Sequence, residues 1–239
     1  MKIATWNVAY GRGATLNNRR REQMREIDAD VWVLTETHDG LSPGGAYTPI
    51  HSAQRPMSHE RIVPGSRWVS IWARDRLDAR RLSVTDVERT VACVISSGAG
   101  PLWIFGTVLP WYHDRDRDGF LVELGRQRQD WEHNFREVSP LGCLAGDFNV
   151  NLGGPHYYGR TDSQQAVQQA LSSLDMVAVT DHAHTSPARP AFGLIDHLAV
   201  SSSISVLKNP PTVWERSNGR GELMSDHAGA AVELQVDHL

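Results

Sequence analysis

Short apolar runs alternate along the chain with polar segments that carry glycine, asparagine and aspartate. Residues 2–8 and 30–36 are apolar and rich in β-forming side chains, so each run predicts a strand. The charged segment between them, residues 19–27, predicts a helix with Asn17 or Asn18 as its N-terminal cap. Strand, helix and strand in succession favour a parallel or mixed sheet.

The rest of the chain continues this mixture of strands and helices. Residues 37–66 form a loop-rich stretch with room for one short strand. Further strands are predicted at residues 67–73, 89–96, 101–108, 140–147, 195–201 and 228–236, the first three in a meander-like, antiparallel succession. Apolar positions at helical spacing predict helices at residues 118–136 and 163–174. No linker or repeat interrupts the series, so we expect one α/β domain over residues 1–239.

Composition narrows the class of protein. The 239 residues are 40% hydrophobic and 22% charged, as in ordinary soluble proteins. The apolar runs are far shorter than the roughly 20 residues of a membrane-spanning helix, and the first residues do not resemble a secretory leader. Cys93 and Cys143 lie in strand-like runs and are expected to be buried, reduced thiols. We therefore expect a cytoplasmic monomer with no membrane partner.

Polar residues gather at the ends of the apolar runs. Asn7 and Glu36 end the first two predicted strands, and Gly-Asp-Phe-Asn at residues 146–149 ends another. Ile-Asp-His at 195–197 and Ser-Asp-His at 225–227 open the last two. Each element alone is also explained by a turn, a cap or a solvated surface pair. Because strand ends can meet at one edge of a sheet, the whole set indicates a common pocket.

The residue types in this set favour a hard divalent cation. Four carboxylates, two amides and one imidazole are present, without a thiolate: Glu36, Asp147, Asp196, Asp226, Asn7, Asn149 and His227. Carboxylate and carbonyl oxygens select Mg²⁺, Mn²⁺ or Ca²⁺, and Mg²⁺ commonly shares its ligand shell with a substrate phosphate. Four clustered acids would repel one another unless a cation lay among them.

Together these motifs resemble the endonuclease/exonuclease/phosphatase superfamily of metal-dependent phosphoesterases, which includes exonuclease III and deoxyribonuclease I. The matching segments are Thr5-Trp6-Asn7-Val8, Glu36 with the strand before it, Gly146-Asp147-Phe148-Asn149, Ile195-Asp196-His197 and Ser225-Asp226-His227. They span nearly the whole chain. The resemblance implies a four-layer α/β sandwich, in which two mixed β-sheets pack face to face with helices outside.

The resemblance also implies a metal site. Glu36 is expected to be the principal ligand of Mg²⁺, with Mn²⁺ as a substitute, and Asn7 lies beside it. Asp226 is expected to complete or approach the metal shell. Nuclease relatives often carry an acid two residues after the first asparagine, where this chain has Ala9, so a second metal site of that kind is not expected.

The catalytic roles follow from the same resemblance. Asp147 is expected to orient or deprotonate the attacking water, and Asn149 to bind a phosphate oxygen. His227 is expected to contact the scissile phosphate, with Asp196 holding its ring and favouring the imidazolium. A cationic His227 beside the metal would stabilise negative charge that develops on the phosphate oxygens.

Substrate contacts are expected from loop residues. The chain carries a net charge of −4, unlike a dedicated nucleic-acid binder. Eight tryptophans and an arginine-rich basic set nevertheless lean toward nucleic acid. The expected substrate-binding residues are Thr107, Trp111, His113, His156, Tyr157 and Arg160, with Arg12, Arg19, Arg20 and Arg21 as further candidates for phosphate contacts. Packing or solvation is the alternative explanation for each of them.

These observations predict a Mg²⁺- or Mn²⁺-dependent phosphodiesterase that acts by water attack, a nuclease on DNA or another nucleic acid. The alternative is a phosphomonoesterase that acts on a small phosphorylated metabolite or a lipid headgroup. A non-catalytic binding module is a third hypothesis, which the presence of Glu36, Asp147 and His227 disfavours.

Overall fold

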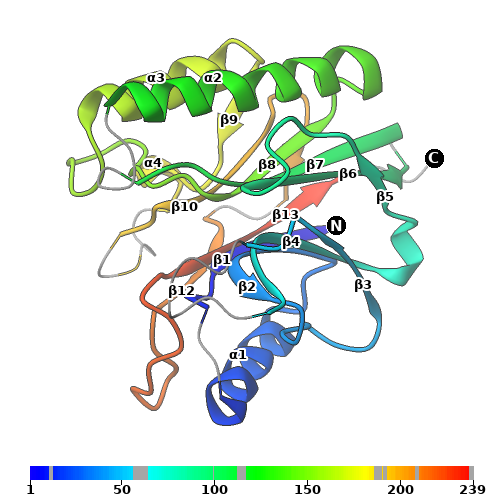
Figure 1. Ribbon diagram of the computed structural model, residues 1–239, viewed down its shortest axis with the longest axis vertical. Coiled ribbons are helices and arrows are strands. Elements are labelled where there is room, and N and C mark those ends of the chain that lie inside the picture. The colour runs from blue at the N-terminus through cyan, green and yellow to red at the C-terminus, as the bar shows by residue number, and fades with distance from the viewer. Residues whose placement is uncertain are drawn as a thin grey trace.

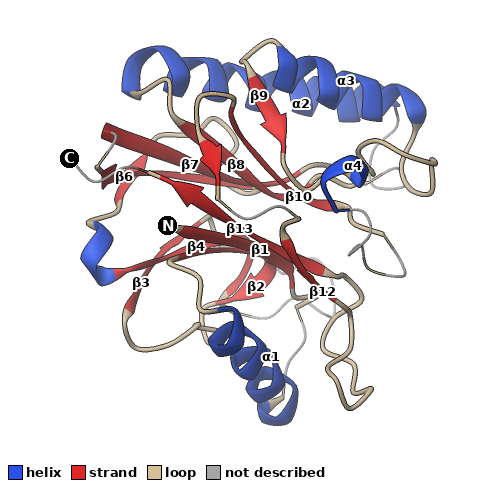
Figure 2. Cartoon of the chain, turned by 180° about the vertical axis from the view of Figure 1, so that it is seen from behind, coloured by secondary structure: helices blue, strands red, loops and turns tan. Residues whose placement is uncertain are grey.

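Two mixed β-sheets pack face to face, and helices cover the outer face of each, as the resemblance predicts (Figure 1). The computed structural model describes residues 1–10, 13–55, 64–98, 100–111, 117–185, 190, 193–207 and 210–236. Seen from behind, α1 lies against the first sheet, whereas α2 and α3 lie against the second (Figure 2). The order of layers is therefore helix, sheet, sheet, helix.

The first sheet joins the two ends of the chain. Its strands are β1 (Lys2–Asn7), β2 (Val31–His38), β3 (Tyr47–His51), β4 (Ser66–Arg74), β11 (Ser205–Val206), β12 (Thr212–Trp214) and β13 (Gly229–Gln235). Their order is β11-β13-β1-β2-β4-β3, and β12 also pairs with β13. β1 and β2 are parallel and are connected by α1 (Ala14–Ile27), which confirms the predicted strand–helix–strand unit.

The second sheet comes from the middle of the chain. Its strands, in spatial order, are β5 (Arg80–Leu82), β6 (Thr90–Ser97), β7 (Gly100–Val108), β8 (Gly142–Asp147), β10 (Asp196–Ser201) and β9 (Met176–Ala178). β7 and β8 are parallel. α2 (Arg117–His133) connects them and continues as a π-helical turn, Asn134–Val138. α3 (Thr161–Ser172) and the short α4 (His182–Thr185) lie between β8 and β10 in the sequence.

Three expectations about the elements are corrected. The strands predicted at 67–73 and 89–96 do not form one meander, because β4 and β6 belong to different sheets. The first helix begins at Ala14, so Asn17 lies inside it and does not cap it. The short strands β5, β9, β11 and β12 have two or three residues each, too few for a periodic pattern to reveal.

Apolar side chains fill the spaces between the layers. Val33, Ile71 and Ile104 belong to the cluster between the two sheets, while Trp103 and Phe105 lie in the cluster that includes residues of α2 and α3. Of the eight tryptophans, seven are buried. The tryptophan content therefore reflects core packing and gives no support for nucleic-acid binding. Among the helices in the described ranges, none has the length and apolarity needed to cross a membrane.

The two cysteines are free and buried, as expected. Burial raises the pKa of Cys93 and of Cys143 to about 12. Both thiols therefore remain protonated at neutral pH and act as small apolar core residues.

Candidate active site

The polar strand ends of both sheets converge at one edge of the sandwich. Parallel pairing places the ends of β1 and β2 together, and Asn7 pairs in register with Thr35, the residue before Glu36. In the second sheet, antiparallel β8 and β10 place Asp147 directly opposite Asp196. The amide of Asn7 donates to Oδ2 of Asp147 over 3.1 Å and so joins the two sheets. The convergence that the sequence predicts is therefore present.

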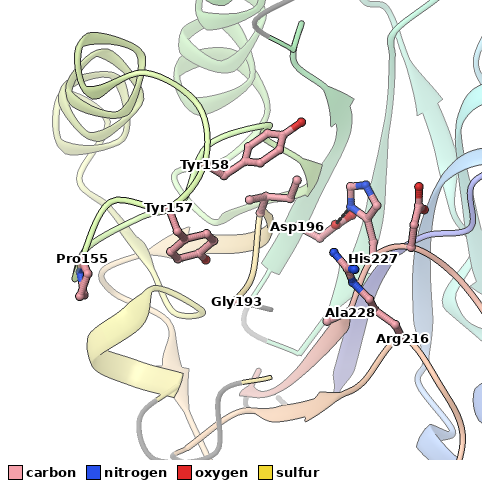
Figure 3. Close-up of a pocket in the computed structure, with 10 residues that line it drawn as sticks. Pro155, Tyr157, Tyr158, Gly193, Asp196, Arg216, His227 and Ala228 are labelled. Atoms are coloured by element: carbon pink, nitrogen blue, oxygen red, sulfur yellow. Dashed lines mark hydrogen bonds and ion pairs between the residues drawn. The ribbon is translucent and has the colours of Figure 1, made fainter. Parts of the chain in front are cut away.

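Asp147, Asp196 and His227 form the centre of this edge. Their ligand atoms lie within 4.8 Å of one another. Nδ1 of His227 donates to Oδ2 of Asp196 over 2.6 Å, while Asp147 and Asp196 are each only 1% exposed. Figure 3 shows this histidine–aspartate pair at the side of a cleft. The arrangement fixes the imidazole ring and its tautomer.

The cluster strongly alters the protonation of its members. Burial alone would lower the pKa of His227, but Asp196, together with Asp147 and Asp226, raises it to about 10. Burial and the neighbouring Asp196 carboxylate raise the pKa of Asp147, although His227 opposes the shift. His227 is therefore cationic at neutral pH, and it partly compensates the crowded acids.

The serine of the Ser-Asp-His segment attaches this segment to the first strand. The hydroxyl of Ser225 donates to the carbonyl of Asn7 over 2.6 Å and accepts the backbone N–H of His227 over 3.2 Å. It also lies 3.4 Å from Oδ1 of Asp226. The indole N–H of Trp6 donates to the carbonyl of His227 over 3.1 Å. These bonds hold the end of the 225–227 segment against β1.

Glu36 lies in an irregular part of its strand. Its φ of 46° is left-handed, and the ladder between β2 and β4 pairs residues 35 and 37 but omits Glu36. The backbone N–H of Tyr10 donates to the Glu36 carbonyl over 2.5 Å. The left-handed backbone interrupts the regular pairing of β2 with β4 at Glu36. A left-handed backbone at a partly buried acid is a feature of functional sites.

Glu36 and Asp226 are near enough for their charges to interact, and carboxylate oxygens suit a hard cation. Burial raises the pKa of Glu36, the charge of Asp226 raises it further, and His227 and a hydrogen bond from Asn7 oppose the shift. Asp226 is exposed, so its carboxylate is open to solvent. In contrast, His227 and Asp196 already use Nδ1 and Oδ2 for each other. A protonated imidazole offers no lone pair to a metal, so Glu36 and Asp226 fit a metal better than this pair does.

The two asparagines are held by neighbouring groups. The side-chain oxygen of Asn7 accepts the backbone N–H of Ala9 over 2.8 Å, while its amide donates to Asp147. Asn149 has a left-handed backbone with φ of 51°, and its amide donates to the carbonyl of Leu109 over 2.8 Å. The backbone N–H of Asn149 donates to Oδ1 of Asp147 over 2.9 Å. Both asparagines therefore position the Asp147 carboxylate.

A cleft of about 610 Å³ opens beside Asp196 and His227. Tyr157 and Tyr158 line it, with Arg216 and Asp226 among its other residues (Figure 3). The predicted contact Tyr157 thus belongs to the cleft. Arg216 is a cleft residue that the sequence does not predict. Tyr158 was visible as a neighbour of Tyr157, but no motif surrounds Arg216.

Other predicted substrate contacts lie elsewhere. Arg160 forms an ion pair with Asp162 at 3.0 Å, at the start of α3, and it does not line the cleft. His156 is exposed, next to the lining residues but not among them. His113 and Arg12 lie outside the described residues. The substrate contact predicted for Arg160 stays a prediction, and its guanidinium already pairs with a local carboxylate.

Thr107 points away from the site. It is fully buried, and its hydroxyl lies 2.5 Å from Oε1 of Gln127 on α2. A side chain at the preceding residue, Gly106, would instead meet Val69 and Val33 of the other sheet. Because side chains alternate along β7, Thr107 faces the helical layer. The expected phosphate contact from Thr107 is therefore corrected.

Trp111 belongs to a stack of aromatic rings and arginines. Its ring centroid lies 6.1 Å from that of Trp68. The guanidinium carbons of Arg55 and Arg89 lie 3.6 and 4.5 Å from the Trp68 ring centroid. Tyr10 also packs edge-on against Trp68 at 6.0 Å. Trp111 therefore packs against other side chains, which is the alternative explanation that the sequence left open beside substrate contact.

The arginines near the start of α1 make internal contacts. Arg19 pairs with Glu222 at 2.6 Å. Arg20 is 1% exposed and donates to the Met224 carbonyl over 2.8 Å, and Arg21 donates to the Gly40 carbonyl over 2.8 Å. These bonds stabilise the loops around the helix. They do not support the predicted phosphate contacts of this run.

Comparison with solved structures identifies the fold. No family model and no curated protein sequence match the chain. An endonuclease/exonuclease/phosphatase from Bacteroides vulgatus is similar, with a TM-score of 0.67, 14% identity and coverage of 99% of this chain and 98% of that one. The endonuclease domain of TRAS1, a telomere-specific non-LTR retrotransposon, has a TM-score of 0.66, 12% identity and 98% coverage of both chains.

A sugar phosphatase shares the architecture to the same degree. The Bacteroides thetaiotaomicron mannosyl-6-phosphatase Bt3783 has a TM-score of 0.67 and 14% identity, over 98% of this chain and 99% of that one. The chain therefore has the endonuclease/exonuclease/phosphatase fold, and the predicted resemblance is confirmed at that level. Nucleases and phosphatases share this fold, so the residues of the site determine the reaction.

Proposed function

We propose that this protein is a divalent-metal-dependent phosphodiesterase that hydrolyses nucleic acid, with DNA as its first candidate substrate. In this proposal residues 1–239 form one domain, and the protein is a cytoplasmic monomer. The observation that carries it is the Asp196–His227 ion pair, at 2.6 Å, beside the buried carboxylate of Asp147. A fixed cation next to a candidate base is suited to hydrolysis of a phosphate ester by water.

Asp147 and His227 have different roles in the proposed hydrolysis: Asp147 acts on the attacking water, and His227 acts on the phosphate. The Asp147 carboxylate, held by Asn7 and by the backbone of Asn149, orients water and accepts its proton. The His227 imidazolium, oriented by Asp196, stabilises negative charge that develops on the phosphate oxygens.

Glu36 and Asp226 are the proposed metal ligands. Mg²⁺ or Mn²⁺ bound there supplies positive charge that polarises the phosphate oxygens. Asn7 stays close to Glu36, but its side-chain oxygen already accepts a backbone N–H. We therefore assign Asn7 a positioning role in place of the predicted ligand role.

Asn149 keeps one donor for the substrate. Its amide carries two hydrogens, and one of them is used by the carbonyl of Leu109. The hydroxyl of Tyr158 donates to Oδ1 of Asn149 over 3.4 Å and so helps to orient the amide. The second N–H of Asn149 is the proposed donor to a phosphate oxygen.

A phosphomonoesterase is the second candidate function. It is favoured by the architecture shared with the mannosyl-6-phosphatase and by the net charge of −4, because a small substrate needs no extended basic surface. Both candidates use the same central residues and differ in what occupies the cleft.

A substrate panel tests the proposal. We expect hydrolysis of bis-p-nitrophenyl phosphate with Mg²⁺ or Mn²⁺ and none with EDTA. Equal rates in both conditions would exclude metal dependence. Single-stranded DNA, nicked duplex, RNA, inositol phosphates and sugar phosphates then separate the two functions. Turnover restricted to monoesters would overturn the nuclease proposal in favour of the second candidate.

A further inference from the structure

The cleft extends beyond the reacting residues between Tyr157 and Tyr158 on one side and Arg216 on the other, and these three lining residues are here called the tyrosine–arginine wall. The cleft volume of about 610 Å³ falls within the range of ligand-sized pockets. It therefore has room for more than a phosphate group. The part of a substrate next to the scissile phosphate would lie against this wall.

The two tyrosines are fixed at their hydroxyl ends and remain partly open to solvent. The Tyr157 hydroxyl donates to the Leu194 carbonyl over 2.5 Å, and that of Tyr158 to Asn149 Oδ1 over 3.4 Å. The residues are still 44% and 40% exposed. Anchored aromatic rings with exposed surface provide a preformed support for a sugar or a base.

Arg216 is held close to the histidine by its own loop. Its carbonyl accepts the backbone N–H groups of Met224 and Ser225, over 2.8 and 3.2 Å. Ser225 begins the segment that carries His227, so the backbone at Arg216 is tied to that segment. Figure 3 shows Arg216 extending toward His227, with both tyrosines across the cleft beyond Asp196.

Arg216 has chemistry that the hydrolysis step does not use. A guanidinium neither binds a metal nor accepts a proton from water. It is the only arginine or lysine among the described residues that line the cleft. A planar fork of N–H donors is suited to binding a phosphate through two hydrogen bonds. Its position indicates a second anionic group beside the scissile one.

We propose that the tyrosine–arginine wall is a subsite for the neighbouring nucleoside, and that Arg216 binds the next phosphate along the substrate. This inference rests on the proposed function and narrows its substrate class. The preferred substrate is a phosphodiester flanked by another phosphate, as in an oligonucleotide. An isolated phosphomonoester lacks the group that Arg216 recognises.

Chromogenic nucleotides test the inference. The substrates are thymidine 5′-(p-nitrophenyl phosphate) and thymidine 3′-(p-nitrophenyl phosphate), each with and without a phosphate on the other hydroxyl. For the wild type we expect one bisphosphate to exceed its parent by about tenfold in kcat/KM, as one charge-assisted contact allows. The two arms show on which side of the scissile bond the second phosphate lies.

Substitutions at Arg216 test whether this residue causes the preference for a second phosphate. In Arg216→Ala the preference for the second phosphate should disappear, and Arg216→Lys should retain part of it. Arg220→Ala is the matched control, because Arg220 lies on the same loop, its side chain is 70% exposed, and it does not line this cleft. It should keep the full preference. Circular dichroism checks that each variant is folded. If Arg216→Ala unfolds, the preference for the second phosphate is measured on Arg216→Lys instead.

Binding provides a readout that needs no turnover. By calorimetry in Ca²⁺ and moderate salt, thymidine 3′,5′-bisphosphate should bind about tenfold more tightly than thymidine 5′-monophosphate, and Arg216→Ala should abolish the difference. Equal affinities, or a preference retained in Arg216→Ala, would overturn the inference. If no ester is hydrolysed at all, the proposed function fails, and calorimetry alone decides the subsite.

Discussion

The His227 imidazole donates to the Asp196 carboxylate over 2.6 Å, although Asp196 begins β10 of the second sheet and His227 lies two residues before β13 of the first, 31 positions away. The second carboxylate oxygen of Asp196, Oδ1, is buried without a hydrogen-bond partner among the described residues. A buried charge of this kind is unfavourable for folding. Its presence indicates that orientation of His227 matters more here than stability.

Asp196→Asn should reduce both activity and stability. We expect kcat to fall by about 10²-fold with little change in KM, because the asparagine keeps the shape but loses the charge that favours the imidazolium. The melting temperature should also fall, since the substitution removes the charge that compensates the partly buried His227 cation. A lower melting temperature with an intact kcat would show that Asp196 has only a structural role. Steady-state kinetics and calorimetric melting measure both quantities.

Asp147→Asn and His227→Ala should each reduce kcat by at least about 10²-fold. The first removes the proton acceptor, and the second removes the cation at the phosphate. Ser202→Ala is a control variant at an exposed position outside the cleft, and it should keep normal turnover of bis-p-nitrophenyl phosphate. If both active-site variants stayed as active as this control, the reaction centre would lie elsewhere.

Metal binding should be visible without any substrate. A ligand that binds only the folded state raises its melting temperature, so millimolar Mn²⁺ should stabilise the wild type. Glu36→Gln should lose most of this shift, because one charged ligand is removed. Glu26→Gln, an exposed position on α1, is the matched control and should retain it. An equal shift in all three proteins would place the metal away from Glu36.

His197 should make the protein sensitive to mild acid. Burial lowers its pKa to about 4, although hydrogen bonds with Val150 and Thr180 and the charge of Asp196 oppose the shift. The unfolded chain has the ordinary histidine pKa near 6.5, so the unfolded state binds the proton first as the pH falls. Stability from the neutral ring is therefore complete above about pH 6.5 and is lost toward about pH 4, by about 3 kcal/mol.

Urea unfolding across this range measures the effect against His197→Gln. The variant has no group that titrates at this position, so its free energy of unfolding should fall less steeply between about pH 6.5 and pH 4.5. Carboxylates titrate in both proteins and cancel in the comparison. Parallel curves would mean that His197 is not held neutral.

Much of the fold was readable from local patterns. The apolar runs located the longer strands, and the helical spacing located α2 and α3, because burial of one face leaves a period in the sequence. In the Gly-Asp-Phe-Asn segment, the glycine itself indicates an unusual backbone conformation. Gly146 has φ of 139°, and a side chain there would lie 2.0 Å from the Thr107 carbonyl. Glycine is therefore required immediately before Asp147.

The sequence by itself determined which residue types stand at the strand ends, and hence the acids, amides and histidine of the candidate site. Tertiary structure decided which of them meet. Thr107 lies on a strand that is buried on both faces. Apolar and polar residues therefore do not alternate along it, and the sequence does not show which way the Thr107 side chain points. The place of Arg216 beside His227 depends on hydrogen bonds between segments of one loop. Such contacts follow from packing across the sheets, which leaves no local signal in the chain.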